Sequence, residues 1–297
     1  MKAFNDLIYT YKNGNYLVKI FNDGSKVRFS LEDSFNAVFP ESVDLKITNY
    51  CDNNCAMCHE NSSILGEHAS FNHPFLQTLK RGTELAIGGG NPFSHPDLFS
   101  FLTKMKNQGV ICNITVNQAH FVKHKREIEF YLEKSLIYGL GISVIDESYI
   151  DVIIEFATKN SGVVIHLIAG IVTEKILSKL SYKNLKILIL GYKEFGRGIR
   201  YYSLSVKEKI DYLKENVLQI SKGFKVLSFD NLAIDQLEIE KQIPKADFDS
   251  YYMGDDGQFT MYIDLVKKQF AINSVSEKRF GLLDDITEMF KIVKNKQ

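Results

Sequence analysis

The sequence predicts an α/β fold in which strands and helices alternate. Six apolar, strand-like runs are each followed by a stretch with the periodicity of an amphipathic helix. The strands are predicted at residues 43–48, 85–87, 111–116, 141–145, 163–168 and 185–190. The helices that follow them are predicted at residues 71–80, 96–107, 121–134, 149–159, 174–180 and 207–221. This alternation implies a parallel sheet with right-handed crossovers, arranged as a partial barrel or as a doubly wound sheet.

Two smaller parts flank the alternating region. Strands at residues 16–21 and 26–29 are joined by the turn Asn22-Asp23-Gly24-Ser25, which predicts a β-hairpin near the N-terminus. After residue 222 the alternation stops. There the sequence predicts a strand at residues 226–229, a hairpin of residues 259–264 and 269–272, and a final helix at residues 280–293. We therefore expect an N-terminal appendage (1–42), a central βα region (43–222) and a C-terminal extension (223–297).

Composition narrows the functional classes. The 297 residues are 45% hydrophobic and 24% charged, as in an ordinary globular protein. Thirty-six basic residues balance thirty-six acidic ones, so no overall field attracts nucleic acid or an anionic membrane. Apolar runs such as residues 185–190 are too short to span a bilayer, and residues 1–11 lack the apolar core of a signal peptide. We expect a cytoplasmic protein without a membrane partner.

Three of the four cysteines lie together. Cys51, Cys55 and Cys58 follow the first strand of the alternating region with spacings of three and two residues, which is too local for a disulfide framework. Three thiolates on one short loop can hold three irons of a [4Fe–4S] cluster and leave the fourth iron open. A structural zinc site with His59 as fourth ligand is the alternative. The adjacency of Cys58 and His59 makes a shared tetrahedral site awkward.

A Cys-x₃-Cys-x₂-Cys loop after the first strand of a βα series resembles the radical S-adenosylmethionine (SAM) superfamily. The resemblance implies a partial (β/α)₆ TIM-type barrel with a short N-terminal β-hairpin and a C-terminal α+β extension. It also implies that Cys51, Cys55 and Cys58 hold one [4Fe–4S] cluster, whose open iron binds SAM. In that family, reduction of the cluster by an external donor such as flavodoxin or ferredoxin cleaves SAM. The resulting 5′-deoxyadenosyl radical abstracts hydrogen from a substrate.

The same resemblance suggests the SAM contacts. The motif Gly88-Gly89-Gly90-Asn91 is similar to the family's glycine-rich motif, which receives the SAM amino group, with Asn91 where an acidic residue is common. Asn117 and Ser143 resemble the polar residues that reach the ribose or carboxylate, and Met57 and Tyr192 stand at positions near adenine. Each has a structural alternative: a tight βα turn for the glycines, a polar strand end for Asn117 and Ser143, and plain packing for Tyr192.

Several other residues near the predicted site have two interpretations. Side chains alternate along a strand, so if Asn117 points inward then Cys112 points outward and is a packing residue. His166 either faces inward, where it touches substrate or cofactor, or is a satisfied core histidine. His59 and Glu60 either line the substrate cavity or stabilise the cysteine loop.

The C-terminal extension contains no cysteine, which predicts a single cluster. Its resemblance to the extensions of peptide-modifying radical SAM enzymes favours a peptide substrate. A nucleoside or other small metabolite is the alternative substrate. A catalytically inactive cluster-binding sensor or partner protein is the alternative function, motivated by Asn91 and by the extension without cysteines.

Overall fold

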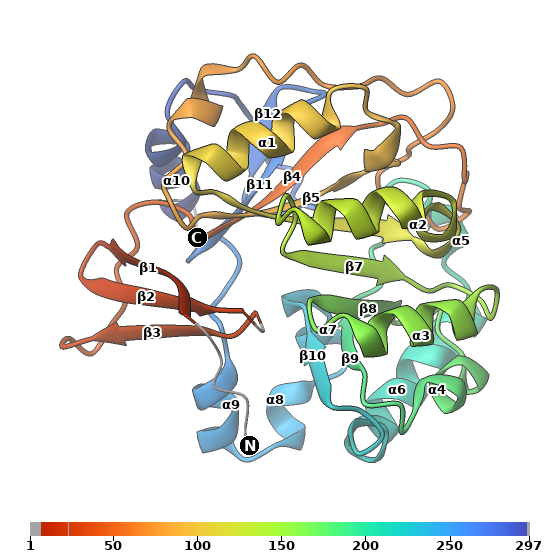
Figure 1. Ribbon diagram of the computed structural model, residues 1–297. Helices are drawn as coiled ribbons and strands as arrows, with labels where there is room; N and C mark the ends of the chain where they lie inside the picture. Colours follow the sequence, from red (N-terminus) through yellow and green to blue (C-terminus); the bar gives the residue numbers. More distant parts are fainter. Residues whose placement is uncertain (1–6, 23, 296–297) are drawn as a thin grey trace.

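The computed structural model describes residues 7–22 and 24–295. Residues 1–6 and 296–297 of the two predicted outer parts, and Asp23 of the predicted turn, lie outside the described residues. The described chain forms a three-stranded sheet and a ten-stranded sheet, with helices packed around the larger one (Figure 1).

The larger sheet confirms the predicted parallel βα series. Seven strands run parallel in chain order: β4 (Ser42–Thr48), β5 (Glu84–Gly89), β6 (Ile111–Asn117), β7 (Gly139–Ser143), β8 (Val163–Ile168), β9 (Lys186–Leu190) and β10 (Val226–Phe229). The helices between them are α1 (Leu98–Gln108), α2 (Gln118–Glu133), α3 (Ile150–Lys159), α4 (Glu174–Leu180), α5 (Gly198–Tyr201) and α6 (Leu204–Ser221). The fold is therefore α/β with a large, mostly parallel sheet.

The strands separate apolar side chains from polar ones on opposite faces of the sheet. On β6, Cys112, Ile114 and Val116 are buried in the main hydrophobic core, whereas Asn113 and Thr115 on the other face are partly exposed. The outward position predicted for Cys112 is confirmed, and burial raises the pKa of its thiol to about 12. We refer to the polar side, which carries Asn113 and Thr115, as the inner face of the sheet.

Segments after residue 222 extend both ends of this sheet. Strand β10 pairs with β9 at one end, while β11 (Thr260–Asp264) pairs in parallel with β4 and continues into antiparallel β12 (Gln269–Ala271) and β13 (Phe280–Gly281) at the other. Short helices α7 (Asn231–Gln236), α8 (Ile239–Gln242) and α9 (Lys245–Tyr251), which the sequence did not predict, connect the two ends. Strands from both sides of the predicted boundary at residue 222 thus belong to one sheet, and the division into domains stays a prediction.

Side chains join the two ends of the sheet across the inner face. Asp256 accepts hydrogen bonds from Asn231, which follows β10, at 2.9 Å and from Asn273, which follows β12, at 2.8 Å. Lys193, which follows β9, donates to Ser274 Oγ at 2.9 Å. Because these partners lie near opposite ends of the strand order, the sheet must curl. Within residues 7–22 and 24–295, β10 and β13 end the order without pairing with each other.

Two helices differ from the prediction. The stretch predicted as a helix at residues 71–80 forms only one 3₁₀ turn, η1 (Pro74–Gln77). The Gln108 side chain donates to the carbonyls of Leu76 and Leu79, and the Thr78 hydroxyl donates to that of Phe75. These side chains satisfy carbonyls that a longer helix would have bonded internally.

The final helix is also shorter than predicted. Residues 280–281 form strand β13 against β12, and α10 (Ile286–Lys294) begins only after Asp285. The Asp285 carboxylate accepts from the backbone N–H of Thr287 at 2.7 Å, which is an N-cap that fixes the start of the helix.

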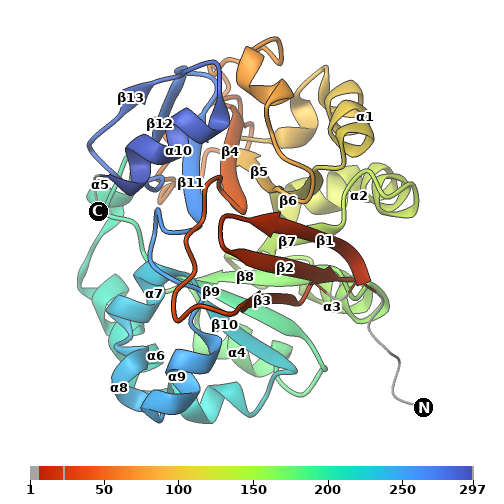
Figure 2. The same cartoon turned by 90° about the vertical axis from the view of Figure 1, so that its left-hand side faces the viewer.

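The N-terminal part has three strands rather than the predicted two. Strand β1 (Leu7–Asn13) pairs antiparallel with β2 (Tyr16–Phe21), which pairs with β3 (Lys26–Ser30). Figure 2 looks onto the starts of the parallel strands and shows this small sheet lying across them, at the opposite end from the loops that follow the strands.

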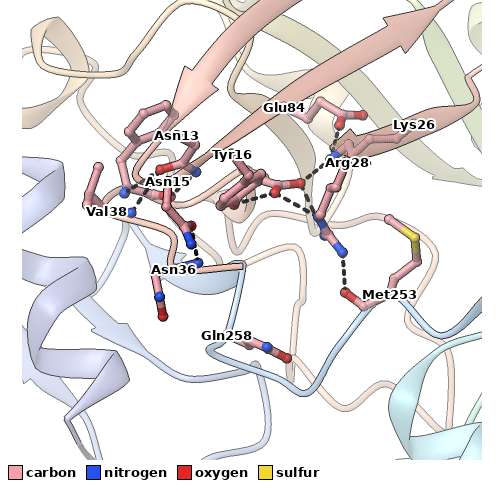
Figure 3. A network of polar contacts seen from close by, with 12 residues as sticks. Asn13, Asn15, Tyr16, Lys26, Arg28, Asn36, Val38, Glu84, Met253 and Gln258 are labelled. Carbon is pink, nitrogen blue, oxygen red and sulfur yellow. Dashed lines mark hydrogen bonds and ion pairs between the residues drawn. The ribbon is translucent and has the colours of Figure 1, made fainter. Parts of the chain in front are cut away.

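A buried polar network connects the small sheet to the large one, and Figure 3 shows Tyr16, Lys26, Arg28 and Glu84 of this network. Glu41, just before β4, accepts a hydrogen bond from the Tyr16 hydroxyl at 2.6 Å and pairs with Arg28 at 2.8 Å and Lys26 at 3.2 Å. Lys26 also pairs with Glu84 at the start of β5, at 2.5 Å. Burial opposes the ionisation of Glu41, but Lys26 and Arg28 outweigh it and hold the pKa of Glu41 below its usual value.

Glu41→Ala would leave Lys26 and Arg28 without their shared partner. We expect the free energy of unfolding to fall by about 3 to 5 kcal/mol, measured by urea denaturation at pH 7. Glu133→Ala, on an exposed helix end, is the matched control and should change it by less than about 0.5 kcal/mol. Because the folded-state pKa of Glu41 is lowered, its contribution is present at neutral pH and disappears as the pH falls through that pKa. A Glu41→Ala protein as stable as the wild type would contradict the role of Glu41 in joining the two sheets.

Candidate functional site

The three clustered cysteines lie on the loop that leaves β4 at its carboxyl end. Cys51, Cys55 and Cys58 are all partly exposed and free. The loop is shaped by backbone bonds from Cys51 to Ser63 at 2.9 Å and from Cys58 to Cys55 at 3.2 Å. Burial raises the pKa of the Cys51 and Cys55 thiols, so a bound cation would be needed to keep them as thiolates at neutral pH.

Arg197, after β9, holds one side of the loop. Its Nε donates to the Cys55 carbonyl at 3.0 Å, and both of its terminal nitrogens donate to the Ser62 carbonyl at 3.0 Å. Its backbone N–H donates to the Cys58 carbonyl at 3.0 Å. Gly196 has a positive φ of 57°, and a Cβ there would lie 2.4 Å from the His59 carbonyl oxygen, so only glycine allows this approach. Arg197 has no local signal in the sequence, because its partners are backbone atoms far away in the chain.

Helix α2 holds the other side of the loop through Asp52. The Asp52 carboxylate lies 2.7 Å from the buried His120 ring and 2.8 Å from Lys123 Nζ. The hydrogen bond from Lys123 lowers the pKa of Asp52, and His120 adds to the effect. The charged start of α2 therefore positions the segment between Cys51 and Cys55.

The positions of the ligand atoms bear on which metal the loop fits. Among the described residues, three potential ligand atoms come within 4.8 Å of one another at Cys51, Asp52 and His120. The three cysteine sulfurs form no such group, whereas a single zinc ion would draw its sulfur ligands to about 3.8 Å from each other. His59 faces Glu60, with 3.5 Å between Nε2 and Oε1, and is not part of this group. Three separated thiols on one loop suit a multi-iron cluster better than one tetrahedral ion.

The glycines after β5 have different structural roles. A Cβ at Gly89 would lie 2.4 Å from the Thr48 carbonyl oxygen, and one at Gly90 would lie 2.0 Å from that of Tyr50, so both glycines allow close packing against the end of β4. A Cβ at Gly88 would meet no atom within 4 Å, so Gly88 borders open space on the inner face. Asn91 is buried, and its side-chain oxygen accepts from Phe93 N–H as the N-cap of η2 (Pro92–Ser94).

The other predicted SAM contacts fall into two groups. Asn117 and Ser143 are register partners on β6 and β7; Asn117 Oδ1 caps α2, whereas Ser143 is half-buried and its hydroxyl bonds to no described residue. Met57 packs against a small apolar cluster formed by the buried Ile171, Tyr192 and Val206. The backbone N–H of Tyr192 already donates to Gln236 and its hydroxyl to the Gly198 carbonyl. Their roles toward SAM stay predictions.

A buried ionic network that includes Glu60 lies beneath the loop, and the sequence predicted only part of it. Glu60 accepts from Lys46 Nζ at 2.5 Å and from the Tyr262 hydroxyl at 3.1 Å, and Lys46 also pairs with Asp264 at 3.3 Å. Burial opposes the ionisation of Glu60, but His59 and Lys46 outweigh it and lower its pKa. The network links the cysteine loop to β4 and β11, which favours the loop-stabilising interpretation of Glu60. The sequence signal was Lys46, a charge placed between the apolar residues Leu45 and Ile47 of β4.

Comparison with known proteins was informative only at the level of structure. No family model and no curated protein matches the chain. Solved structures do match, and those that match include structures of SuiB from Streptococcus suis. The fold is similar to that of SuiB. SuiB bound to S-adenosylmethionine aligns with a TM-score of 0.57 at 15% identity, and the match covers 82% of this chain and 64% of SuiB.

Two further SuiB structures agree. SuiB bound to the precursor peptide SuiA aligns with a TM-score of 0.57 at 16% identity, covering 86% of this chain and 65% of SuiB. A third SuiB structure aligns with a TM-score of 0.57 at 13% identity, and the match covers 96% of this chain and 87% of SuiB. The chain thus spans slightly less than two thirds of SuiB in the first two comparisons. At these identities the likeness establishes the fold.

Arg197→Met should loosen the cysteine loop, because it removes three hydrogen bonds to loop carbonyls. In metal-free protein we expect the three loop thiols to react several-fold faster with a thiol-labelling disulfide reagent, followed by mass spectrometry of the labelled peptides. Cys112 should stay unreactive, because its thiol is buried with a raised pKa. Arg200→Met, on the exposed side of α5, is the matched control. Equal labelling rates in all three proteins would remove Arg197 from this role.

Proposed function

We propose that the protein is a radical SAM enzyme with a single [4Fe–4S] cluster. The observation that carries the proposal is a loop with three separated thiols at the carboxyl end of β4, in a fold similar to one that binds SAM in SuiB. On this proposal the sheet is the predicted partial (β/α)₆ barrel, and the site lies where α/β barrels hold their active sites.

Residues of this chain have distinct roles in the proposed site. Cys51, Cys55 and Cys58 would hold the cluster, and Arg197 and Asp52 would keep their loop in place. When reduced by an external donor such as flavodoxin or ferredoxin, the cluster supplies the electron that cleaves SAM to a hydrogen-abstracting 5′-deoxyadenosyl radical.

The predicted SAM contacts fit this assignment to different degrees. Gly88 leaves room for a ligand to approach the inner face, and the Ser143 hydroxyl, which bonds to none of the described residues, is available to bond one. Met57 is partly exposed beside the apolar cluster that contains the buried Tyr192, and an adenine ring would pack against an apolar side chain of this kind. Gly89, Gly90, Asn91 and Asn117 would then act mainly by positioning the backbone around the site.

A peptide is the proposed substrate class. It is supported by the SuiB structure with a precursor peptide, and a nucleoside or other small metabolite is the alternative. The second candidate function is an inactive cluster-binding sensor. The buried Asn91, whose side chain caps a 3₁₀ turn and so does not replace the acidic SAM contact, favours that candidate.

The location of the protein follows from its thiols. No helix in the described part of the chain is long and apolar enough to cross a bilayer. We propose a cytoplasmic location, because a reducing compartment keeps clustered thiols available for iron.

The cysteines can be tested individually. Replacing Cys51, Cys55 or Cys58 by Ala should abolish the reducible cluster and the formation of 5′-deoxyadenosine. Cys112→Ala should leave iron content near normal, because its thiol lies on the far face of β6. The measurements are iron and sulfide content, the optical spectrum, and mass spectrometry of the reduced protein with SAM under anaerobic conditions.

Each result separates the candidate functions. Product in the wild type above the Cys55→Ala control supports the enzyme, whereas a cluster that binds SAM without product supports the sensor. Zinc without the broad iron–sulfur absorbance would refute the cluster.

Ser143→Ala tests the SAM site. We expect the dissociation constant of SAM to rise about tenfold, which corresponds to the loss of one hydrogen bond worth about 1.4 kcal/mol, with iron content unchanged. Ser148→Ala, on the loop that follows β7, is the control. An unchanged SAM affinity in Ser143→Ala would exclude Ser143 from the cofactor site.

A further inference from the structure

The inner face of the large sheet is lined with polar groups that have no partner among the residues that the structure describes. Asp44 on β4, Asn113 and Thr115 on β6, Ser143 on β7 and His166 on β8 all occupy inward positions and are at least partly exposed. None of these side chains hydrogen-bonds to a residue in the described part of the chain. Branched apolar side chains usually fill the interior of an α/β barrel, so this polar wall points to a ligand.

Small residues leave room along the same wall. The inward positions of β5 and β7 carry Ala86, Gly88, Gly139, Gly141 and Ser143, between the larger polar residues of β4, β6 and β8. The space at Gly139 is taken by the Asn113 amide and that at Gly141 by the His166 ring, whereas the space at Gly88 is open. The open space therefore lies between β4 and β6.

His166 is held in place by packing rather than by hydrogen bonds. A Cβ at residue 141 would lie 2.3 Å from His166 Cε1 and 2.6 Å from Nε2, so the imidazole rests against the Gly141 backbone. Its Nδ1 is buried without a hydrogen-bond partner. Burial lowers the pKa of His166 to about 4, so the ring is neutral at pH 7 and offers one donor and one acceptor. It is also the register partner of Ser143. The interpretation as a satisfied core histidine is therefore wrong.

Asp44 differs from the other acidic residues on β4 and β11 and on the loop after β4. Glu60 and Asp264 share Lys46, and Asp52 pairs with Lys123, but Asp44 forms no ion pair with a described residue. The Asp44 side chain is open to solvent, but the protein groups around it displace much of that solvent, and this desolvation raises its pKa to about 6; Lys193 opposes the shift, and Asp256, Asp230 and Glu60 add to it. Those groups follow β9, β10 and β4 or precede β11, so Asp44 faces a space that the curled sheet encloses. The ionised carboxylate there lacks a neutralising contact.

We propose that this inner wall is the substrate site, that Asp44 receives a protonated nitrogen of the substrate, and that His166 hydrogen-bonds an uncharged polar group of it. On the proposed function, the substrate is then a peptide segment with a cationic side chain inserted into the sheet. Gly88 provides the room, and the position of Ser143 beside His166 makes the substrate wall continuous with the predicted SAM contacts.

The test uses two probes whose side chains differ by one terminal ammonium group. Nα-acetyl-lysine N-methylamide carries the ammonium group, and Nα-acetyl-norleucine N-methylamide lacks it. Dissociation constants are measured by equilibrium dialysis with mass spectrometry on reconstituted protein with SAM under anaerobic conditions. We expect the wild type to bind the lysine probe about tenfold more tightly than the norleucine probe.

Four variants separate the roles of the two residues. Asp44→Asn should abolish the preference for the lysine probe, while Asp44→Glu and the surface control Asp151→Asn keep it. His166→Phe preserves the flat ring on Gly141 but removes both nitrogens, so it should weaken both probes several-fold without changing their ratio. Circular dichroism and SAM affinity should match the wild type in every variant, which excludes a general folding defect.

Equal binding of the two probes by the wild type would overturn the proposal, as would a preference that persists in Asp44→Asn. Unchanged binding in His166→Phe would exclude His166. The same wild-type sample tests the proposed function independently, through SAM binding and 5′-deoxyadenosine formation. A protein that cleaves SAM but does not distinguish the probes would retain the function and refute this inference. A protein that holds no cluster but still distinguishes the two probes would support this inference and refute the proposed function.

Discussion

Strand β4 has a parallel partner on each side. This double pairing fixes which side chains of β4 point to each face of the sheet. Val43, Leu45 and Ile47 point into the main core, so the alternate residues must line the inner face. The same pairing determines where β4 ends, and therefore where the cysteine loop begins. The start of the loop is therefore positioned by a strand with a buried apolar face.

In addition to its internal hydrogen bonds, the loop is held by distant segments of the chain. Arg197 arrives from beyond β9, Asp52 is anchored by α2, and Glu60 is tied through Lys46 to β11. These contacts bond carbonyls and carboxylates and leave the three thiols free. A loop built this way can keep its shape while its sulfur atoms remain available to a metal, which agrees with the proposed function.

Local signals in the sequence predicted the regular parts of the structure. All six strands of the βα series follow from apolar runs, and the cysteine loop follows from its spacing. The helix at residues 71–80 was wrong because Gln108, a residue distant in sequence, satisfies its carbonyls. The parallel pairing of β11 with β4 could not be predicted either, since no local pattern specifies a partner more than 200 residues away.

The candidate site divides in the same way. The spacing of Cys51, Cys55 and Cys58 was enough to predict a metal-binding loop. The alternation of side chains along β6 was enough to predict that Cys112 points outward. The partners of Arg197 and Glu60 arise only when the sheet curls. His166 could be predicted in part. The strand pattern assigned it to β8, but only the structure shows that its Nδ1 is buried without a hydrogen-bond partner.

The late position of β11 in the sequence also affects how the protein is made. Residues 42–48 leave the ribosome long before residues 260–264, so β4 must wait with one unpaired edge while most of the chain is synthesised. An unpaired strand edge is prone to aggregation, and such a distant pairing closes slowly. The final assembly of the cysteine loop, whose Glu60 network depends on β11, is therefore expected to be among the last steps of folding. On the proposed function, iron would then be loaded after β11 has paired with β4.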